Sequence, residues 1–75
     1  MVELDGMLSI VMPAYNEEKL IYQSIIKTLD IVSGFVREIE LIAVNDGSKD
    51  NTKAEILRAV RKDKRVQEKN GYPLR

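Results

Sequence analysis

Polar side chains that could do chemistry follow two short apolar stretches of this 75-residue chain. Asn16 and Glu17 come directly after the first stretch, and Asn45 and Asp46 end the second. The chain contains neither histidine nor cysteine, which are the commonest general base and the thiolate metal ligand. Acid, base or metal chemistry would therefore fall mainly to carboxylates, and both stretches supply them.

Two strand-to-helix units are needed to position these groups. Four of the five residues 8–12 are apolar and Pro13 ends the run, which predicts a buried strand over residues 8–13. Apolar residues then recur at helical spacing, which predicts a helix over residues 17–33. Asn16 is the expected N-terminal cap, and Gly34 is the expected left-handed end of the helix.

The second unit repeats this order. The apolar run within residues 39–45 is interrupted only by Glu40, which predicts a parallel strand covered on both faces. A helix over residues 51–62 follows, with Asp50 or Asn51 as its cap. Residues 65–69 are a candidate third strand, short and polar, and residues 1–6 are expected to be a lead-in without structure.

The first three elements form a βαβ unit, whose crossover is right-handed in nearly all known cases. Both strands then end at the same edge of the sheet. Residues 13–17 are therefore expected beside residues 45–48, in the crevice where open α/β sheets bind ligands. The predicted fold class is α/β, with a small parallel sheet.

The composition narrows the class of protein. A hydrophobic content of 44% indicates a folded chain, and 75 residues allow one small, partial domain. The 12 basic and 12 acidic residues cancel, so no global field favours nucleic acid. No apolar run suggests a membrane-spanning segment, and a cytoplasmic location is expected. Because two strands and two helices leave a parallel sheet half-covered, self-association or a borrowed strand is also expected.

Over residues 8–66 the chain resembles the opening of family 2 glycosyltransferases with the GT-A fold. In that family one strand ends in Pro-x-Tyr-Asn-Glu, and the next ends in Asp-Asp-Gly-Ser before a helix. This chain has residues 13–17, PAYNE, and residues 45–48, NDGS. The resemblance implies an incomplete, Rossmann-like βαβα unit of the GT-A fold and a nucleotide sugar of the UDP or GDP type as ligand.

The resemblance also implies a set of nucleotide-binding residues: Pro13, Ala14, Tyr15, Glu17, Asn45 and Asp46. The first three would line the pocket of the base, with Glu17 near the ribose or base. Asp46 would accept a hydrogen bond from the base ring, since a carboxylate suits an N–H edge and an aromatic ring can stack on a base. Asn45 stands where the family commonly has a first aspartate, so one charge is lost there.

The sequence lacks residues that the family uses to transfer a sugar. The family holds Mg or Mn through an Asp-x-Asp motif, and no such motif occurs among the 75 residues. A diphosphate leaving group needs its charge neutralised and the acceptor needs a base, so this chain alone is expected not to transfer sugar. The tail EKNGYPLR resembles the start of the family's Asn-x-Gly-Lys-Gly region without its continuation, which suggests truncation near this point.

The alternative function is that of a non-catalytic α/β interaction module that kept the scaffold and lost the ligand. A dinucleotide enzyme and a P-loop enzyme are disfavoured because GxGxxG and GxxxxGK[ST] are both missing from the sequence.

Overall fold

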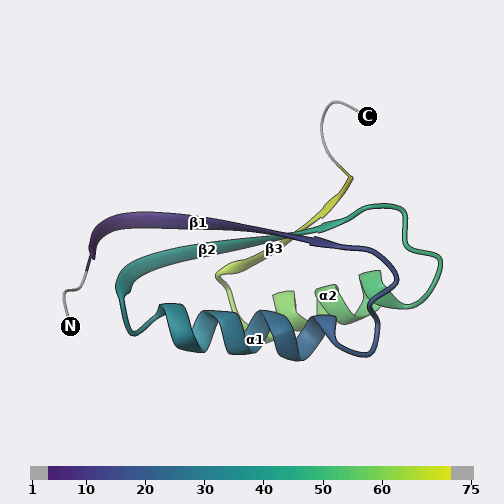
Figure 1. The fold of residues 1–75 in the computed structure, drawn as a ribbon, viewed down its shortest axis with the longest axis horizontal. Helices are drawn as coiled ribbons and strands as arrows, with labels where there is room; N and C mark the ends of the chain where they lie inside the picture. Colours follow the sequence, from purple (N-terminus) through teal and green to yellow (C-terminus); the bar gives the residue numbers. More distant parts are fainter. Residues whose placement is uncertain (1–3, 72–75) are drawn as a thin grey trace.

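The computed structural model describes residues 4–71, which form alternating strands and helices. The strands are β1 (Leu4–Ala14), β2 (Val36–Asn45) and β3 (Val66–Asn70), and the helices are α1 (Ile21–Val32) and α2 (Thr52–Lys62). Figure 1 shows both helices on the same side of the sheet. Within residues 4–71, the other face of the sheet therefore has no second layer.

The sheet has the order β1-β2-β3, and both pairings are parallel. In register, Ile10 lies beside Leu41, and Leu41 lies beside Val66. Each link between neighbouring strands is consequently a crossover through a helix rather than a hairpin. This arrangement confirms the predicted α/β class and the Rossmann-like partial unit with a small parallel sheet.

The core lies between the sheet and the two helices. Alternate side chains of β2 (Ile39, Leu41 and Ala43) point toward the helices and are buried. The helices bury residues at helical spacing against this row: Ile21, Ile25, Leu29, Ile56 and Ala59. Alternation in the strands and a 3.6-residue period in the helices therefore produce a single one-sided core.

Several boundaries differ from those that the sequence predicts. β1 begins at Leu4, so the predicted lead-in is wrong from that residue onward, because Leu4 pairs with Val36 at the far end of β2. β3 begins at Val66, one residue later than the candidate strand. The resemblance of the tail EKNGYPLR falls partly on residues 72–75, which lie outside the described residues.

The ends of α1 also correct the prediction. The helix begins at Ile21 rather than at residue 17, and the amide of Ile21 donates to the carbonyl of Glu17 within a turn that precedes it. At the other end, Ser33 closes the helix by donating to the carbonyl of Leu29. Gly34 does not take the left-handed conformation, because the chain continues through further turns into β2.

Candidate functional site

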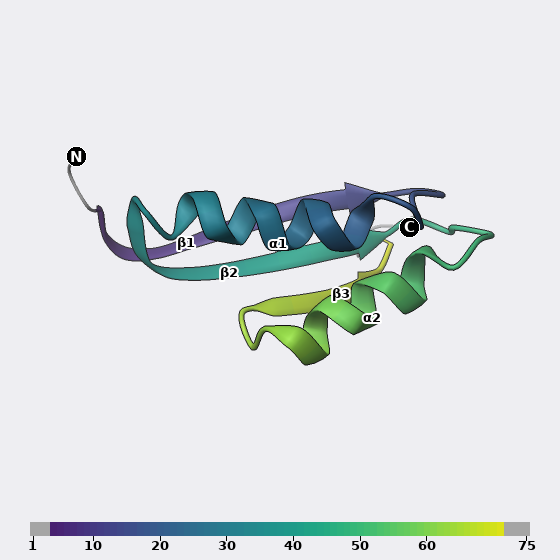
Figure 2. The ribbon, with the colours of Figure 1, turned by 90° about the horizontal axis from the view of Figure 1, so that it is seen from below.

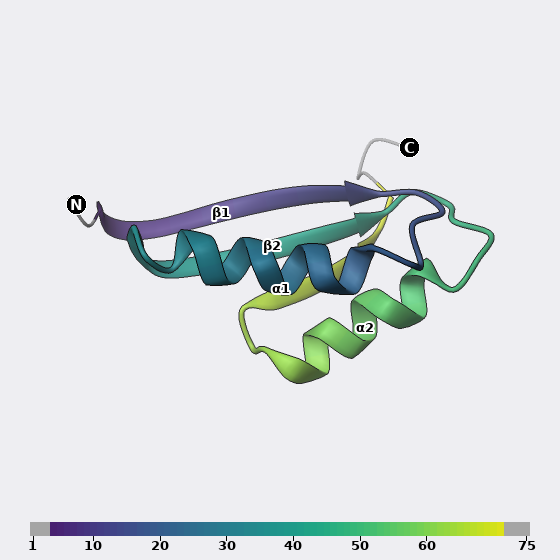
Figure 3. The same ribbon diagram turned by 60° about the horizontal axis from the view of Figure 1, so that its bottom comes forward.

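Two loops meet at the carboxyl edge of the sheet, as the right-handed crossover predicts. The first loop, residues 15–20, follows β1, and the second, residues 46–51, follows β2; Figure 3 shows both at the same end of the molecule. Ala14 pairs with Asn45 in register, and the amide of Asp46 donates to the carbonyl of Ala14 at 3.0 Å. The two loops therefore leave the sheet side by side.

Asn16 joins the first loop to the second. Its backbone amide donates to Ser48 Oγ at 2.9 Å, and its side-chain Oδ1 accepts from the amide of Lys49 at 2.8 Å. Its φ is 49°, a left-handed conformation that asparagine tolerates better than most residues. The expected helix cap is thus wrong: Leu20 precedes α1 without a side-chain cap, because the Asn16 oxygen bonds the other loop.

Thr52 and Asp50 make the second connection between the loops. The amide of Glu17 donates to Thr52 Oγ1 at 2.7 Å, and the amide of Glu18 donates to Asp50 Oδ2 at 3.4 Å. The Thr52 hydroxyl in turn donates to Asp50 Oδ1. Amides of the first loop that could have extended α1 are satisfied by the second loop instead, which explains why the helix starts late.

Asp50 also serves the start of α2. Its Oδ1 accepts from the amide of Thr52 at 2.9 Å, so it takes a capping role although Asn51 is the residue before the helix. The hydroxyl of Thr52 and then the amides of Thr52 and Glu18 lower the pKa of Asp50 below its ordinary value of 3.8, although partial desolvation opposes them. The charged form of Asp50 is therefore the one that holds the loops together.

This pKa shift predicts how the loops respond to acid. Because the pKa of Asp50 is lowered on folding, its contribution to stability is present above pH 3.8 and is lost as pH falls through the lower folded pKa. We expect urea unfolding of the wild type to lose stability in acid, and Asp50→Asn to be less stable at pH 7 with a flatter pH profile. The comparison variant is Asp63→Asn. It also removes a carboxylate whose pKa is lowered, here by Arg65, but this carboxylate does not connect the two loops. An unchanged profile in Asp50→Asn would contradict the role of this carboxylate.

The structure places the predicted residues of β1 on different surfaces. Pro13 is exposed on the face of the sheet away from the helices, whereas the side chain of Ala14 is buried in the core. Tyr15 is 55% exposed at the start of the first loop, and its amide donates to Glu17 Oε1 at 3.3 Å. Tyr15 and Glu17 are thus together at the edge, with Ala14 beneath them.

The two predicted residues after β2 differ in burial. Asn45 is buried, and its Oδ1 accepts from the amide of Ser48 at 3.2 Å, so its side chain shapes the turn that contains Gly47. Gly47 has a φ of 75°, which favours glycine at that position. Asp46 is half-buried at the entrance of this turn, between Asn45 and the first loop. The edge thus presents an aromatic ring and carboxylates on a cross-linked pair of loops.

The sequence did not indicate the residues that lock the loops, Ser48 and Thr52. The spacing Asp50-x-Thr52 is the one signal that could have done so, as an acidic cap before a helix. Beside them, residues 16–20 and Asp50 line an open hollow of about 290 Å³. This hollow touches the same carboxyl edge as the predicted residues.

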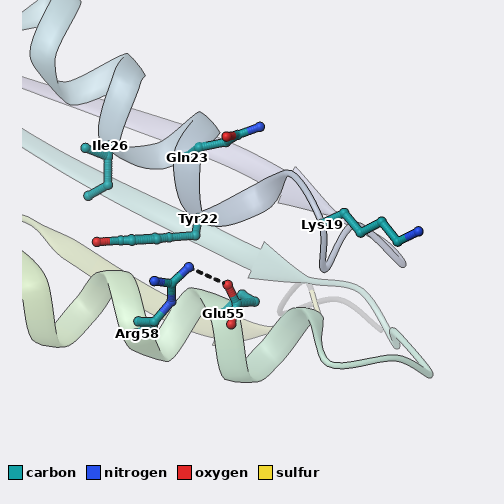
Figure 4. Close-up of a pocket in the computed structure, with 6 residues that line it drawn as sticks. All are labelled: Lys19, Tyr22, Gln23, Ile26, Glu55 and Arg58. Carbon is teal, nitrogen blue, oxygen red and sulfur yellow. Dashed lines mark hydrogen bonds and ion pairs between the residues drawn. The ribbon is translucent and has the colours of Figure 1, made fainter.

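A second hollow lies between the helices and reaches the first loop only at Lys19. It measures about 330 Å³ and is shown in Figure 4, with Lys19, Tyr22, Gln23, Ile26, Glu55 and Arg58 around it. The Arg58 guanidinium lies 3.6 Å from the centre of the Tyr22 ring and pairs with Glu55 at 2.7 Å. Because Arg58 is already engaged and no predicted residue lies there, the carboxyl edge is the candidate site.

Within residues 4–71, no three Asp, Glu, His or Cys side chains lie together in a way that could hold a metal ion. Neither α1 nor α2 is long and apolar enough to cross a membrane.

The chain is similar to known proteins over most of its length. The sequence pattern described as Glycosyl transferase family 2 matches residues 9–70. An uncharacterised glycosyltransferase of Synechocystis sp. is 33% identical over 60 residues, covering 80% of this chain and 19% of that protein. A dolichyl-phosphate beta-glucosyltransferase of Trichomonas vaginalis is 42% identical over 55 residues, covering 67% of this chain and 17% of that protein.

A third relative agrees with these two. An uncharacterised glycosyltransferase of Bacillus subtilis is 44% identical over 50 residues, which cover 67% of this chain and 15% of that protein. The chain therefore spans less than a fifth of the length of these curated relatives. No solved structure matches the chain.

Proposed function

This chain belongs to glycosyl transferase family 2, and we propose that its carboxyl edge binds the nucleotide half of a nucleotide-diphosphate sugar. The observation that carries the proposal is the cross-linking of the two loops that hold Tyr15 and Asp46. Binding sites gain affinity when the loops that form them are ordered before the ligand arrives. Here the hydrogen bonds of Asn16 and Thr52 provide that order without a ligand.

In this proposal each predicted residue has a defined task. The exposed ring of Tyr15 stacks on the base, and the Asp46 carboxylate accepts a hydrogen bond from a ring N–H. Glu17 lies near the ribose or base. Pro13 and Ala14 end β1 and set the direction in which Tyr15 leaves the sheet, while Asn45 shapes the turn beside Asp46.

The proposal extends to the donor and the reaction. A UDP or GDP sugar is the expected donor, in a cytoplasmic setting, and the complete family domain would use Mg or Mn to neutralise its diphosphate. Residues 1–75 contain no Asp-x-Asp motif and no histidine. We therefore propose that this stretch supplies nucleotide binding, and that transfer to an acceptor needs groups it does not contain.

Two-dimensional amide NMR of the purified chain, titrated with UDP and then with GDP, tests this function. We expect shifts confined to Tyr15, Glu17 and residues 45–48. Asp46→Ala and Tyr15→Ala should each weaken binding about tenfold, since a hydrogen bond to a charged group or one stacked base is worth roughly 1–3 kcal/mol. Asp30→Ala, which removes an exposed carboxylate on α1, is the matched control and should bind like the wild type.

The same titration separates this function from the alternative. A well-dispersed spectrum that responds to neither nucleotide would exclude nucleotide binding by these residues. It would favour the non-catalytic interaction module, in which Asp46→Ala has no effect on any ligand. Shifts that instead gather around Tyr22 and Arg58 would move the site to the hollow between the helices.

A further inference from the structure

A continuous chain of hydrogen bonds runs from the second loop to Tyr15 in the first. The Thr52 hydroxyl donates to Asp50 Oδ1, and its oxygen accepts from the amide of Glu17 at 2.7 Å. Glu17 Oε1 accepts in turn from the amide of Tyr15 at 3.3 Å. Figure 2 shows both loops at the end of the molecule where the two helices begin. Asp50 is thereby connected to the exposed ring at the carboxyl edge.

The Asp50 carboxylate decides which way the Thr52 hydroxyl points. A threonine hydroxyl has a single hydrogen, and here Asp50 receives it, so the lone pairs of Thr52 Oγ1 are left to accept the amide of Glu17. Asp50 Oδ1 also accepts the amide of Thr52 at 2.9 Å, which holds the two side chains together. Thr52 is 0% exposed, so solvent does not reach its hydroxyl.

The first loop has a second anchor, at Asn16, that does not involve Asp50. The amide and Oδ1 of Asn16 bond Ser48 and Lys49 of the second loop. These bonds keep the two loops adjacent even where the other anchor is lost. Loss of the Asp50 carboxylate should therefore loosen Glu17 while the loops stay side by side.

We propose that Asp50 is a positioning residue of the nucleotide site, which acts on Tyr15 through Thr52 and Glu17. Asp50 itself makes no contact with the nucleotide. It orients the hydroxyl that anchors Glu17, and the Glu17 carboxylate fixes the backbone from which the Tyr15 ring projects. A ring that is held before the base arrives loses less conformational entropy on binding. This inference rests on the proposed function, in which the ring stacks on the base.

Amide hydrogen exchange of the chain without nucleotide tests the first half of the inference. In Asp50→Ala the Glu17 amide should exchange about tenfold faster, measured relative to the core amide of Leu41, because its acceptor is no longer oriented. Asp50→Asn keeps an oxygen for Thr52 and should restore most of the protection. Asp63→Ala, which removes a carboxylate at the other end of α2, is the matched control and should leave Glu17 as in the wild type. Unchanged exchange in Asp50→Ala would overturn the inference.

A double-mutant cycle of nucleotide binding tests the second half. Asp50→Ala should weaken the binding of UDP about tenfold, which is the order expected when one stacked base is lost. In a Tyr15→Ala background the same substitution should cause no further loss, since the ring that Asp50 positions is already gone. Equal losses in both backgrounds would show that Asp50 acts on the whole fold and not on Tyr15, which overturns the inference.

The outcomes separate this inference from the proposed function. A wild type that binds UDP while Asp50→Ala binds it equally well would overturn the positioning role alone. A wild type that binds neither UDP nor GDP would overturn the proposed function and the positioning role together. If Asp50→Ala fails to fold, Thr52→Val removes the same link from the other side and takes its place in both measurements.

Discussion

Replacing Ile25 by alanine is expected to leave the chain largely unfolded at room temperature. Ile25 is 0% exposed at the centre of α1, against the buried side chains of the sheet. Deleting such a side chain typically costs about 2–5 kcal/mol, because the cavity is only partly refilled. A domain of this size has roughly that much stability in total. Circular dichroism during urea titration would show the loss of the folded baseline.

Ile31→Ala is the matched control, since it removes the same atoms from the solvent-exposed part of the same helix. It should change the urea midpoint little at low concentration. Both variants are measured at two protein concentrations, so that any association is separated from folding. Equal losses in the two variants would show that the one-sided core does not carry the stability assigned to it.

Thr52→Val is expected to damage both stability and the candidate site. Thr52 is 0% exposed, and its hydroxyl accepts the amide of Glu17 and donates to Asp50. Valine keeps the volume but leaves that amide without its acceptor, which costs roughly 1–3 kcal/mol for a buried group. Urea unfolding measures the first effect. The second is a weaker response of Tyr15 and residues 45–48 to nucleotide in the amide spectrum.

Thr52→Ser separates the hydroxyl from the methyl group. Serine keeps the acceptor for Glu17, so nucleotide binding should persist while stability falls only by the lost methyl contact. If Ser and Val variants bind nucleotide equally, the connection between the loops does not order the site. The proposed function would then need another source of preorganisation.

The strands and the position of the site follow from local pattern and a general rule. The apolar run at residues 39–45 predicts a parallel strand, and the right-handed crossover predicts that the loops after β1 and β2 meet. Both features are confirmed by the structure, because chain direction and apolar pattern are encoded in short stretches of sequence. The predicted cover on both faces of this strand is wrong within residues 4–71, because both helices pack on the same side of the sheet (Figure 1). The family resemblance is confirmed by the match over residues 9–70.

The connections within the site could not be predicted in the same way. Asparagine commonly caps helices, yet the side-chain Oδ1 of Asn16 accepts a hydrogen bond from the amide of Lys49, 33 residues away. Thr52 appeared to be an ordinary residue of a helix start, yet it accepts the amide of Glu17, 35 residues away. When a local cap competes with a partner from a distant loop, only the tertiary arrangement decides. Ala14 shows the same effect: the resemblance implies a place in the pocket of the base, whereas its side chain is buried in the core.

The all-parallel pairing of the sheet has a consequence for how the chain reaches this structure. Ser9 lies beside Glu40, 31 residues later, and the described strands form no hairpin that could begin pairing locally. Closing such distant contacts costs loop entropy before any pairing energy is gained, which slows folding. During synthesis, β1 therefore emerges as a largely apolar segment before β2 is available to pair with it. In that interval it is the part of the chain most exposed to aggregation and to capture by chaperones.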